Sequence, residues 1–234
     1  MSGIIGNNIV KDGLVLHLDA ADRKSYPGSG TIWYDRSGNI NNATLTNGPT
    51  FNSGNGGYFS FDGTDDYVQT NYDQDTTNRQ LSWECWFWDN SAGGGFSDTT
   101  ALISNYKTTT TPFTILHIYG STAPSGGILF GQQNSSSVGA YVTYSTNVCD
   151  SVWHQIVGVV DSTTMYLYID GTLKGSTAKI SGTTRSGQGL IIAGNHFSRY
   201  QSCRMSIVRV YDNKALSAAE VSQNFNATRK RFNI

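Results

Sequence analysis

Paired carboxylates are the first chemistry to consider in this sequence, which has only two glutamates, Glu84 and Glu220. Hydrolysis of a glycosidic bond needs two carboxyl groups roughly 5–9 Å apart. Glu84 lies in an apolar stretch and Glu220 stands at the start of a predicted helix, so we do not expect them to form such a pair. The aspartates stand mostly beside Gly, Thr or Ser, as in turns. A glycoside hydrolase is therefore the least favoured function.

Other catalytic groups are not arranged for reaction either. No Gly-x-Ser-x-Gly motif marks a nucleophile, and the histidines are scattered along the chain. His17 and His117 have apolar neighbours, which favours core or half-exposed positions over the role of a catalytic base. We therefore predict that the protein is not an enzyme.

Two aspartate-rich segments offer oxygen ligands to calcium, which binds six to eight oxygens. One contains Asp62, Asp65 and Asp66, and the other spans residues 35–39. Neither has the spacing of an EF-hand. We favour structural turns for both segments and keep calcium as an alternative, with Asp62, Asp65 and Asp66 as its candidate ligands.

Aromatic side chains near strand ends are candidates for a sugar platform, because sugar sites combine an aromatic surface with a few placed polar groups. The four candidates are Trp88, Tyr106, Tyr119 and Tyr200. Three other tryptophans lie in or beside apolar runs and are assigned to the core: Trp33, Trp86 and Trp153. With 13 tyrosines in the chain, several are expected at the surface in any case.

The overall composition limits the choice of partner. Charged residues make up 14% of the 234 residues and the net charge is −1, which predicts no attraction to nucleic acid or to an acidic membrane. Residues 229–231 are basic, and we assign them to the end of a helix, where cations stabilise the helix dipole. Cys85, Cys149 and Cys203 are too few and too widely spaced for a disulfide framework. No signal peptide or membrane-spanning segment is recognisable, which indicates synthesis in a cytoplasm.

The elements that must position these residues are predicted to be strands almost throughout. Leu81–Trp88 carries apolar side chains on both faces, which indicates a central strand. Asp170-Gly171 between two apolar runs predicts a hairpin whose two turn residues have positive φ. Residues 20–57 are rich in turn residues. The predicted strands are 13–19, 57–63, 66–70, 81–88, 101–104, 114–119, 127–131, 140–144, 153–160, 165–169, 172–174, 189–194 and 205–211.

One short helix is predicted near the C-terminus. Ser217 is its N-cap, Glu220 completes a capping box, and Leu216 with Val221 forms a hydrophobic staple. The chain shows no internal repeat and no linker, so we predict one domain over residues 13–234. Residues 1–12 are predicted to be an N-terminal arm.

Nine short motifs, in family order, give the chain a resemblance to laminin G-like, concanavalin A-like jelly rolls. The resemblance implies two antiparallel sheets with the first and last strands adjacent, and a binding or adhesion module that in some members uses calcium. Within this family, the sequence is similar to virion proteins of tailed, often marine, bacteriophages. The resemblance does not identify any binding-site residue in this sequence. The motifs are Gly13–Asp19, Ser25–Gly30, Trp33–Gly38, Phe61–Val68, Trp83–Phe87, Trp153-His154, Leu167–Gly171, Val208–Tyr211 and Ala215–Glu220.

The favoured function is that of a non-enzymatic virion structural protein of a phage, as a capsid decoration or a tail or neck accessory protein with a glycan-binding, adhesive role. The alternative is a stand-alone carbohydrate-binding lectin module. The expected partners are other virion proteins and host or environmental glycans, without nucleic acid or membrane. We expect a homo-oligomer located on the virion. Residues 1–12 either dock onto the particle or form a frayed terminus, and the sequence favours neither.

Overall fold

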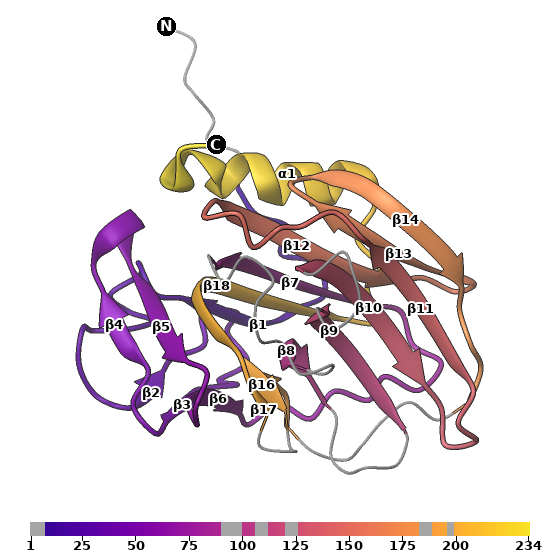
Figure 1. Cartoon of the computed structure of the whole chain (residues 1–234), viewed down its shortest axis with the longest axis horizontal. Coiled ribbons are helices and arrows are strands. Elements are labelled where there is room, and N and C mark those ends of the chain that lie inside the picture. Colours follow the sequence, from indigo (N-terminus) through magenta and orange to yellow (C-terminus); the bar gives the residue numbers. More distant parts are fainter. Residues whose placement is uncertain (1–7, 90–99, 106–111, 120–125, 183–188, 196–198) are drawn as a thin grey trace, which may run out of the picture.

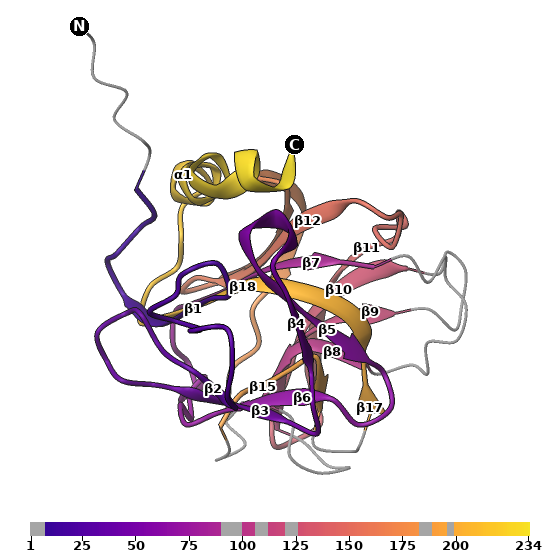
Figure 2. The same cartoon turned by 90° about the vertical axis from the view of Figure 1, so that its left-hand side faces the viewer.

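Alternating apolar and polar side chains build two antiparallel sheets that pack face to face (Figure 1). The structure is a computed structural model and describes residues 8–89, 100–105, 112–119, 126–182, 189–195 and 199–234. A helix near the C-terminus lies on the outer side of one sheet (Figure 2). This architecture confirms the predicted all-β jelly-roll sandwich with one short C-terminal helix.

The first sheet has the strand order β14-β13-β12-β7-β18-β5-β4, and β1 also pairs with β18. The first and last strands are therefore neighbours, as expected, with Leu16 opposite Val210. The strands of this sheet are β1 (Leu14–Asp19), β4 (Thr50–Asn52), β5 (Tyr58–Asp62), β7 (Leu81–Trp88), β12 (Trp153–Val160), β13 (Thr164–Ile169), β14 (Thr172–Ala178) and β18 (Ser202–Asp212).

The second sheet has the order β11-β10-β9-β8-β15-β6-β3-β2. Two very short strands, β16 (Gly194–Asn195) and β17 (Arg199–Tyr200), pair with each other beside it. The strands of the second sheet are β2 (Ile32–Trp33), β3 (Ala43–Thr46), β6 (Tyr67–Thr70), β8 (Thr100–Ser104), β9 (Phe113–Tyr119), β10 (Gly127–Gln133), β11 (Gly139–Tyr144) and β15 (Ile191–Ile192).

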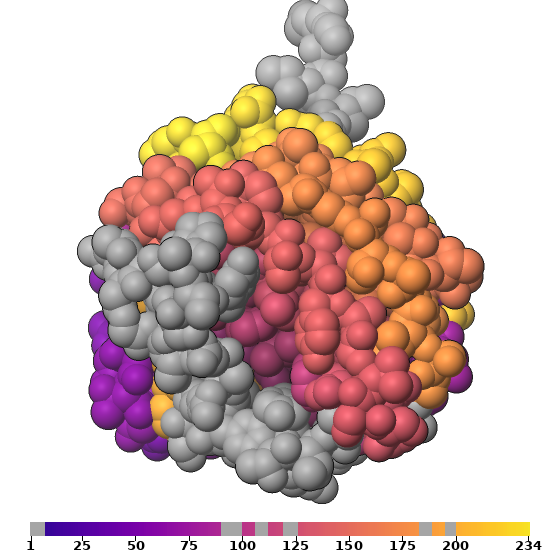
Figure 3. Space-filling model, turned by 45° about the vertical axis from the view of Figure 1, so that its right-hand side comes forward, coloured from indigo at the N-terminus to yellow at the C-terminus, as the bar shows by residue number. Residues whose placement is uncertain are grey.

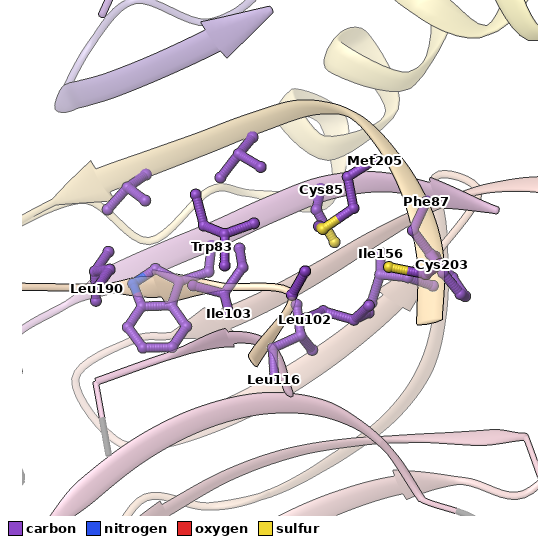
Figure 4. Close-up of a cluster of buried hydrophobic side chains, with 14 of the residues drawn as sticks. Trp83, Cys85, Phe87, Leu102, Ile103, Leu116, Ile156, Leu190, Cys203 and Met205 are labelled. Atoms are coloured by element: carbon purple, nitrogen blue, oxygen red, sulfur yellow. The ribbon is translucent and has the colours of Figure 1, made fainter. Parts of the chain in front are cut away.

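The main core fills the space between the two sheets. β7 and β18 point apolar side chains into it from the first sheet, where they meet Leu102 and Leu116 of the second sheet (Figure 4). The thiols of Cys85 and Cys203 are buried there, and Cys149 is also buried; all three cysteines are free. Burial raises the pKa of the Cys85 and Cys203 thiols, so neither is a reactive nucleophile.

The outer face of the first sheet is covered by helix α1 (Ala218–Thr228) and the 3₁₀ helix η2 (Arg229–Phe232). The ring of Trp86 lies 5.8 Å from that of Phe225 and 4.2 Å from that of Phe232, both stacked. Because this layer covers the outer side, β7 is buried on both faces, as its apolar pattern predicted. In Figure 3 the C-terminal segment, in yellow, lies next to the orange strands of the 164–178 hairpin.

The turn and the helix cap that short sequence motifs predicted are both present in the structure. Ser217 accepts a hydrogen bond from the backbone of Glu220, whose carboxylate accepts one from the backbone of Ser217, which confirms the capping box. Asp170 and Gly171 have φ of 52° and 73°, which confirms the hairpin turn. Among the described residues, no helix is both long and apolar enough to cross a bilayer.

The structure differs from the sequence prediction in the turn-rich segment 20–57, which contributes β2, β3, β4 and the 3₁₀ helix η1 (Gly54–Gly56). These strands are too short for alternation to be visible in the sequence. The predicted strand 189–194 is shorter than expected, because Ala193 has a φ of 59° that interrupts it.

The basic cluster at the C-terminus also has a more specific role than expected. Arg231 forms an ion pair with Asp19 at 2.6 Å and donates to the carbonyl of Gly57 at 2.8 Å. It therefore ties η2 to the first sheet. At the other end of the chain, Val10 is buried against α1, and its N–H donates to Asn224 at 2.8 Å.

Candidate binding site

A small polar pocket opens on the outer face of the first sheet, beyond the part that the helix covers. Arg204 of β18 lies opposite Ser60 of β5 on one side and opposite Trp88 of β7 on the other. Figure 2 shows β5 running beside the first part of β18. The pocket has a volume of about 200 Å³ and is lined mainly by Arg204, Ser60, Ser202, Trp88 and Asp89.

Arg204 is the central cation of this pocket. Its guanidinium carbon lies 3.7 Å from the centroid of the Trp88 ring and 5.4 Å from that of Tyr58. Both contacts are cation–π interactions, which hold the group in place. Within the described part of the chain, no hydrogen-bond acceptor and no carboxylate pairs with the guanidinium. Its N–H groups are therefore open to a ligand.

The neighbouring polar groups are open as well. The hydroxyl groups of Ser60 and Ser202 line the pocket and meet no hydrogen-bond partner among the residues that the structure describes. Asp89 is only 2% exposed, and its carboxylate accepts a hydrogen bond of 3.0 Å from Gln201. The pocket thus offers one guanidinium and two hydroxyls to a ligand rich in hydrogen-bonding groups.

The predicted aromatic candidates are brought together only in part. Trp88 lies in the pocket, but Arg204 occupies a face of its ring, so Trp88 supports the guanidinium instead of offering that face to a sugar. Tyr200 lies two residues before Ser202 and stacks on Tyr67, with ring centroids 5.8 Å apart. Tyr119 belongs to β9 of the second sheet, away from these strands. Tyr106 lies outside the described residues.

The predicted core tryptophans are confirmed. Trp33 and Trp86 are fully buried, and Trp153 is 6% exposed. Trp153 packs against Phe232 of η2 with ring centroids 4.9 Å apart. None of the three is available to a ligand at the surface.

The predicted calcium ligands gather in the turn between β5 and β6, next to the pocket. Ligand oxygens of Asp62, Asp65 and Asp66 all lie within 4.8 Å of one another. Asp62 accepts a hydrogen bond from Thr64, which lowers its pKa, whereas burial and the charges of Asp62 and Asp65 raise the pKa of Asp66. Carboxylate oxygens are the hard ligands that calcium prefers, so the donor set fits this ion. The calcium assignment stays a prediction.

In the second aspartate-rich segment, residues 35–39, the Asp35 carboxylate is already bound by groups of the protein itself. The carboxylate of Asp35 accepts hydrogen bonds from the backbone of His17, Ser37 and Asn41. It fixes the turn of residues 35–39 against β1. This supports the structural interpretation of that segment.

The two glutamates are engaged far from the pocket and in different elements. Glu84 is fully buried beneath α1, where it pairs with Arg209 at 2.5 Å and accepts a hydrogen bond from Asn224 at 2.8 Å. Glu220 caps α1 and pairs with Lys214 at 2.6 Å. The two do not form the acid and base pair of a glycosidase.

Sequence reasoning missed Arg204, Ser60 and Ser202. The apolar run of Met205–Tyr211 was visible, but the strand begins earlier, at Ser202. Ser202 and Arg204 are two residues apart, so they point to the same face once the strand is extended. Their position next to Ser60 follows from strand register, for which the sequence carries no local signal.

Comparisons with known proteins agree with this architecture. The family model for the laminin G-like group of the concanavalin A-like lectin/glucanases superfamily matches residues 62–222. A search of curated proteins found no match.

Solved structures similar to the chain include binding domains of bacterial toxins. The binding domain of Paraclostridial Mosquitocidal Protein 1 superposes with a TM-score of 0.72 at 15% identity, over 93% of this chain and 52% of that one. The binding domain of botulinum neurotoxin serotype D gives a TM-score of 0.71 at 14% identity, over 92% and 51%. The same neurotoxin domain in complex with N-acetylneuraminic acid gives 0.71 at 14% identity, again over 92% and 51%. The chain thus spans about half the length of these domains, and the likeness shows the fold.

Proposed function

This chain belongs to the concanavalin A-like lectin/glucanases superfamily, and from that premise we propose that it is a carbohydrate-binding protein that works without catalysis. The observation that carries the proposal is the pocket around Arg204, Ser60 and Ser202, whose polar groups meet no acceptor or donor within the described residues. Arg204 and Ser60 are half-buried, and polar groups in such positions are normally satisfied, so these two are available to a partner. Ser202 is exposed and adds its hydroxyl at the edge of the pocket.

A sugar residue fits the chemistry and the size of this pocket. Sugars present many hydroxyl groups, which match the guanidinium and the two serine hydroxyls. The volume of about 200 Å³ lies below the roughly 300–1,000 Å³ of pockets for drug-sized ligands, so it suits one sugar unit of a longer chain. The similar toxin structures are binding domains, one of them in complex with a sugar, which supports the same class of ligand.

The superfamily includes both lectins and glucanases, and the positions of the carboxylates favour binding over hydrolysis. The Glu84 carboxylate is engaged in a buried ion pair with Arg209, and the Glu220 carboxylate caps the first turn of α1. Asp89, whose side chain lines the pocket together with Arg204, is buried and accepts a hydrogen bond from Gln201. A general acid and a nucleophile or base flanking the ligand are both needed for hydrolysis.

Affinity electrophoresis and a glycan array with the purified protein test the proposal. We expect retardation or binding by at least one polysaccharide class. Replacing both pocket serines (Ser60→Ala with Ser202→Ala) should weaken that binding by about tenfold, since two hydrogen bonds are lost. Ser176→Ala on the exposed strand β14 is the matched control and should bind like the wild type. No binding to any glycan would rule out the function.

We also propose that the protein presents this pocket on a phage particle, as a capsid decoration or as a tail or neck accessory protein. The support is the resemblance of its motifs to such proteins and its weakly charged, polar composition. Mass spectrometry of purified particles tests the location, and sedimentation tests the expected homo-oligomer. Deletion of residues 1–7, which leaves the buried Val10 in place, should reduce incorporation; unchanged incorporation would rule out docking by this part of the arm.

A further inference from the structure

Resting on the proposed function, we infer that the pocket selects sugars that carry a carboxylate, and that Arg204 is the residue that binds this group. The inference concerns the charge of the ligand, not only its class. It follows from the orientation and the surroundings of one guanidinium.

The contact with Trp88 fixes how Arg204 can be used. At 3.7 Å between the guanidinium carbon and the ring centroid, the indole lies against a face of the guanidinium. All N–H groups of an arginine lie in the guanidinium plane, so this contact covers a face and leaves the donor edge open. A donor edge of this kind matches the two oxygens of a carboxylate, with two parallel hydrogen bonds.

The charge of Arg204 is not neutralised inside the pocket. Asp89 lies in the pocket wall, but its carboxylate is 2% exposed and accepts a hydrogen bond from Gln201. No carboxylate among the described residues forms an ion pair with Arg204. A half-buried cation held against aromatic rings and lacking a counterion favours an anionic partner over a neutral one.

The position of Trp88 argues against a neutral sugar held by stacking. The ring face that a neutral sugar would use is occupied by the guanidinium. The other ring near Arg204, Tyr58, packs edge-on against Trp153 at 5.6 Å. We therefore expect the hydrogen bonds of Arg204, Ser60 and Ser202, not ring stacking, to determine which sugars bind.

The acidic turn beside the pocket weakens the binding of anionic sugars from one side. Asp62 lies opposite Ser202 in the strand pairing, and Asp65 and Asp66 share its turn. These carboxylates repel an anion that approaches from their side. We therefore expect the ligand's carboxylate to lie at Arg204, and we expect removal of the exposed charge of Asp65 to strengthen acid binding.

The experiment compares acids with their uncharged analogues. The probes are oligogalacturonate, oligoglucuronate and a sialylated oligosaccharide, each beside its own methyl ester. Binding is measured by calorimetry in buffer freed of divalent cations by a chelating resin, so that no dissolved carboxylate chelator competes for Arg204. We expect at least one acid to bind about 10- to 100-fold more tightly than its ester. Arg204→Gln should remove this preference, and Arg204→Lys should restore only part of it, because the charge returns without the planar fork.

Two further variants separate the roles of charge and fold. Arg229→Gln is the matched control, because Arg229 also lies over an aromatic ring, 5.8 Å from that of Phe225, but outside the pocket. It should bind every probe like the wild type. Asp65→Asn should tighten binding of acids and leave that of esters unchanged. The urea midpoint of Arg204→Gln is measured alongside, to show that the variant is folded.

The outcomes distinguish the inference from the function on which it rests. If esters or neutral glycans bind as well as acids, or if sulfated glycans bind better than carboxylated ones, the carboxylate assignment is wrong while glycan binding stands. If no glycan binds at all, the proposed function fails as well. A preference for acids that survives Arg204→Gln would assign the selectivity to another residue and overturn the role of Arg204.

Discussion

At the residue scale, His154 shows how two carboxylates decide the charge of one side chain. Its Nδ1 lies 2.7 Å from Asp170 and its Nε2 lies 3.1 Å from Asp150. Burial lowers the pKa of His154, but the hydrogen bonds and charges of Asp170 and Asp150 together raise it more, so the net pKa is above its ordinary value of 6.5. The fold therefore favours the imidazolium form.

This raised pKa predicts a loss of stability with increasing pH. The stabilisation by His154 is fully present below pH 6.5, the unfolded value, and disappears as the pH rises through the higher folded pKa. Urea unfolding between pH 6 and 9 should show the wild type losing stability relative to His154→Gln over this range. A difference between the two proteins that is constant with pH would contradict the pairing.

At the scale of elements, helix α1 is held by its own first turn. The Ser217 hydroxyl accepts a hydrogen bond from the backbone N–H of Glu220. The Glu220 carboxylate accepts one from the backbone N–H of Ser217 and forms an ion pair with Lys214. Its staple residues, Leu216 and Val221, are both buried against the outer face of the first sheet. The helix in turn covers the Trp86 side of that sheet.

Removal of the cap should therefore destabilise the whole protein. Ser217→Ala is expected to lower the free energy of unfolding by about 1 kcal/mol, because an N-terminal N–H loses its acceptor. Ser222→Ala, in the second turn of the same helix, is the control and should change stability by less than about 0.5 kcal/mol. Equal effects of the two substitutions in urea unfolding would show that the cap is not what stabilises the helix.

The elements that the sequence predicted well are those with a strong local signal. The capping box, the Asp170-Gly171 turn and the two-faced strand Leu81–Trp88 were all visible in short stretches of sequence. The binding pocket was not, because it depends on register between β5, β18 and β7. An irregularity between Met205 and Ile207 shifts that register, and it follows from packing of the whole sheet.

At the scale of the whole molecule, one buried polar network joins distant parts of the chain on the outer side of the first sheet. Glu84 binds Arg209 at 2.5 Å, Gln155 at 2.9 Å and Asn224 at 2.8 Å. Asn224 also accepts the N–H of Val10. The network thus connects β7, β12, β18, α1 and the segment before β1. The open pocket at Arg204 lies elsewhere on the same sheet, and no residue of the buried network lines it.

This separation gives a last prediction. Glu84→Gln leaves the Arg209 charge buried without its counterion and should lower the free energy of unfolding by about 3–5 kcal/mol. Asp22→Asn breaks the exposed pair with Arg36, at 2.9 Å, and should cost no more than about 1 kcal/mol. Adding Arg209→Gln to Glu84→Gln should recover part of the loss, since no unpaired charge remains. In native buffer, where each variant is still folded, glycan affinity should equal that of the wild type. If glycan affinity falls with Glu84→Gln in folded protein, the buried network and the pocket are coupled, and the assignment of Glu84 to structure alone is wrong.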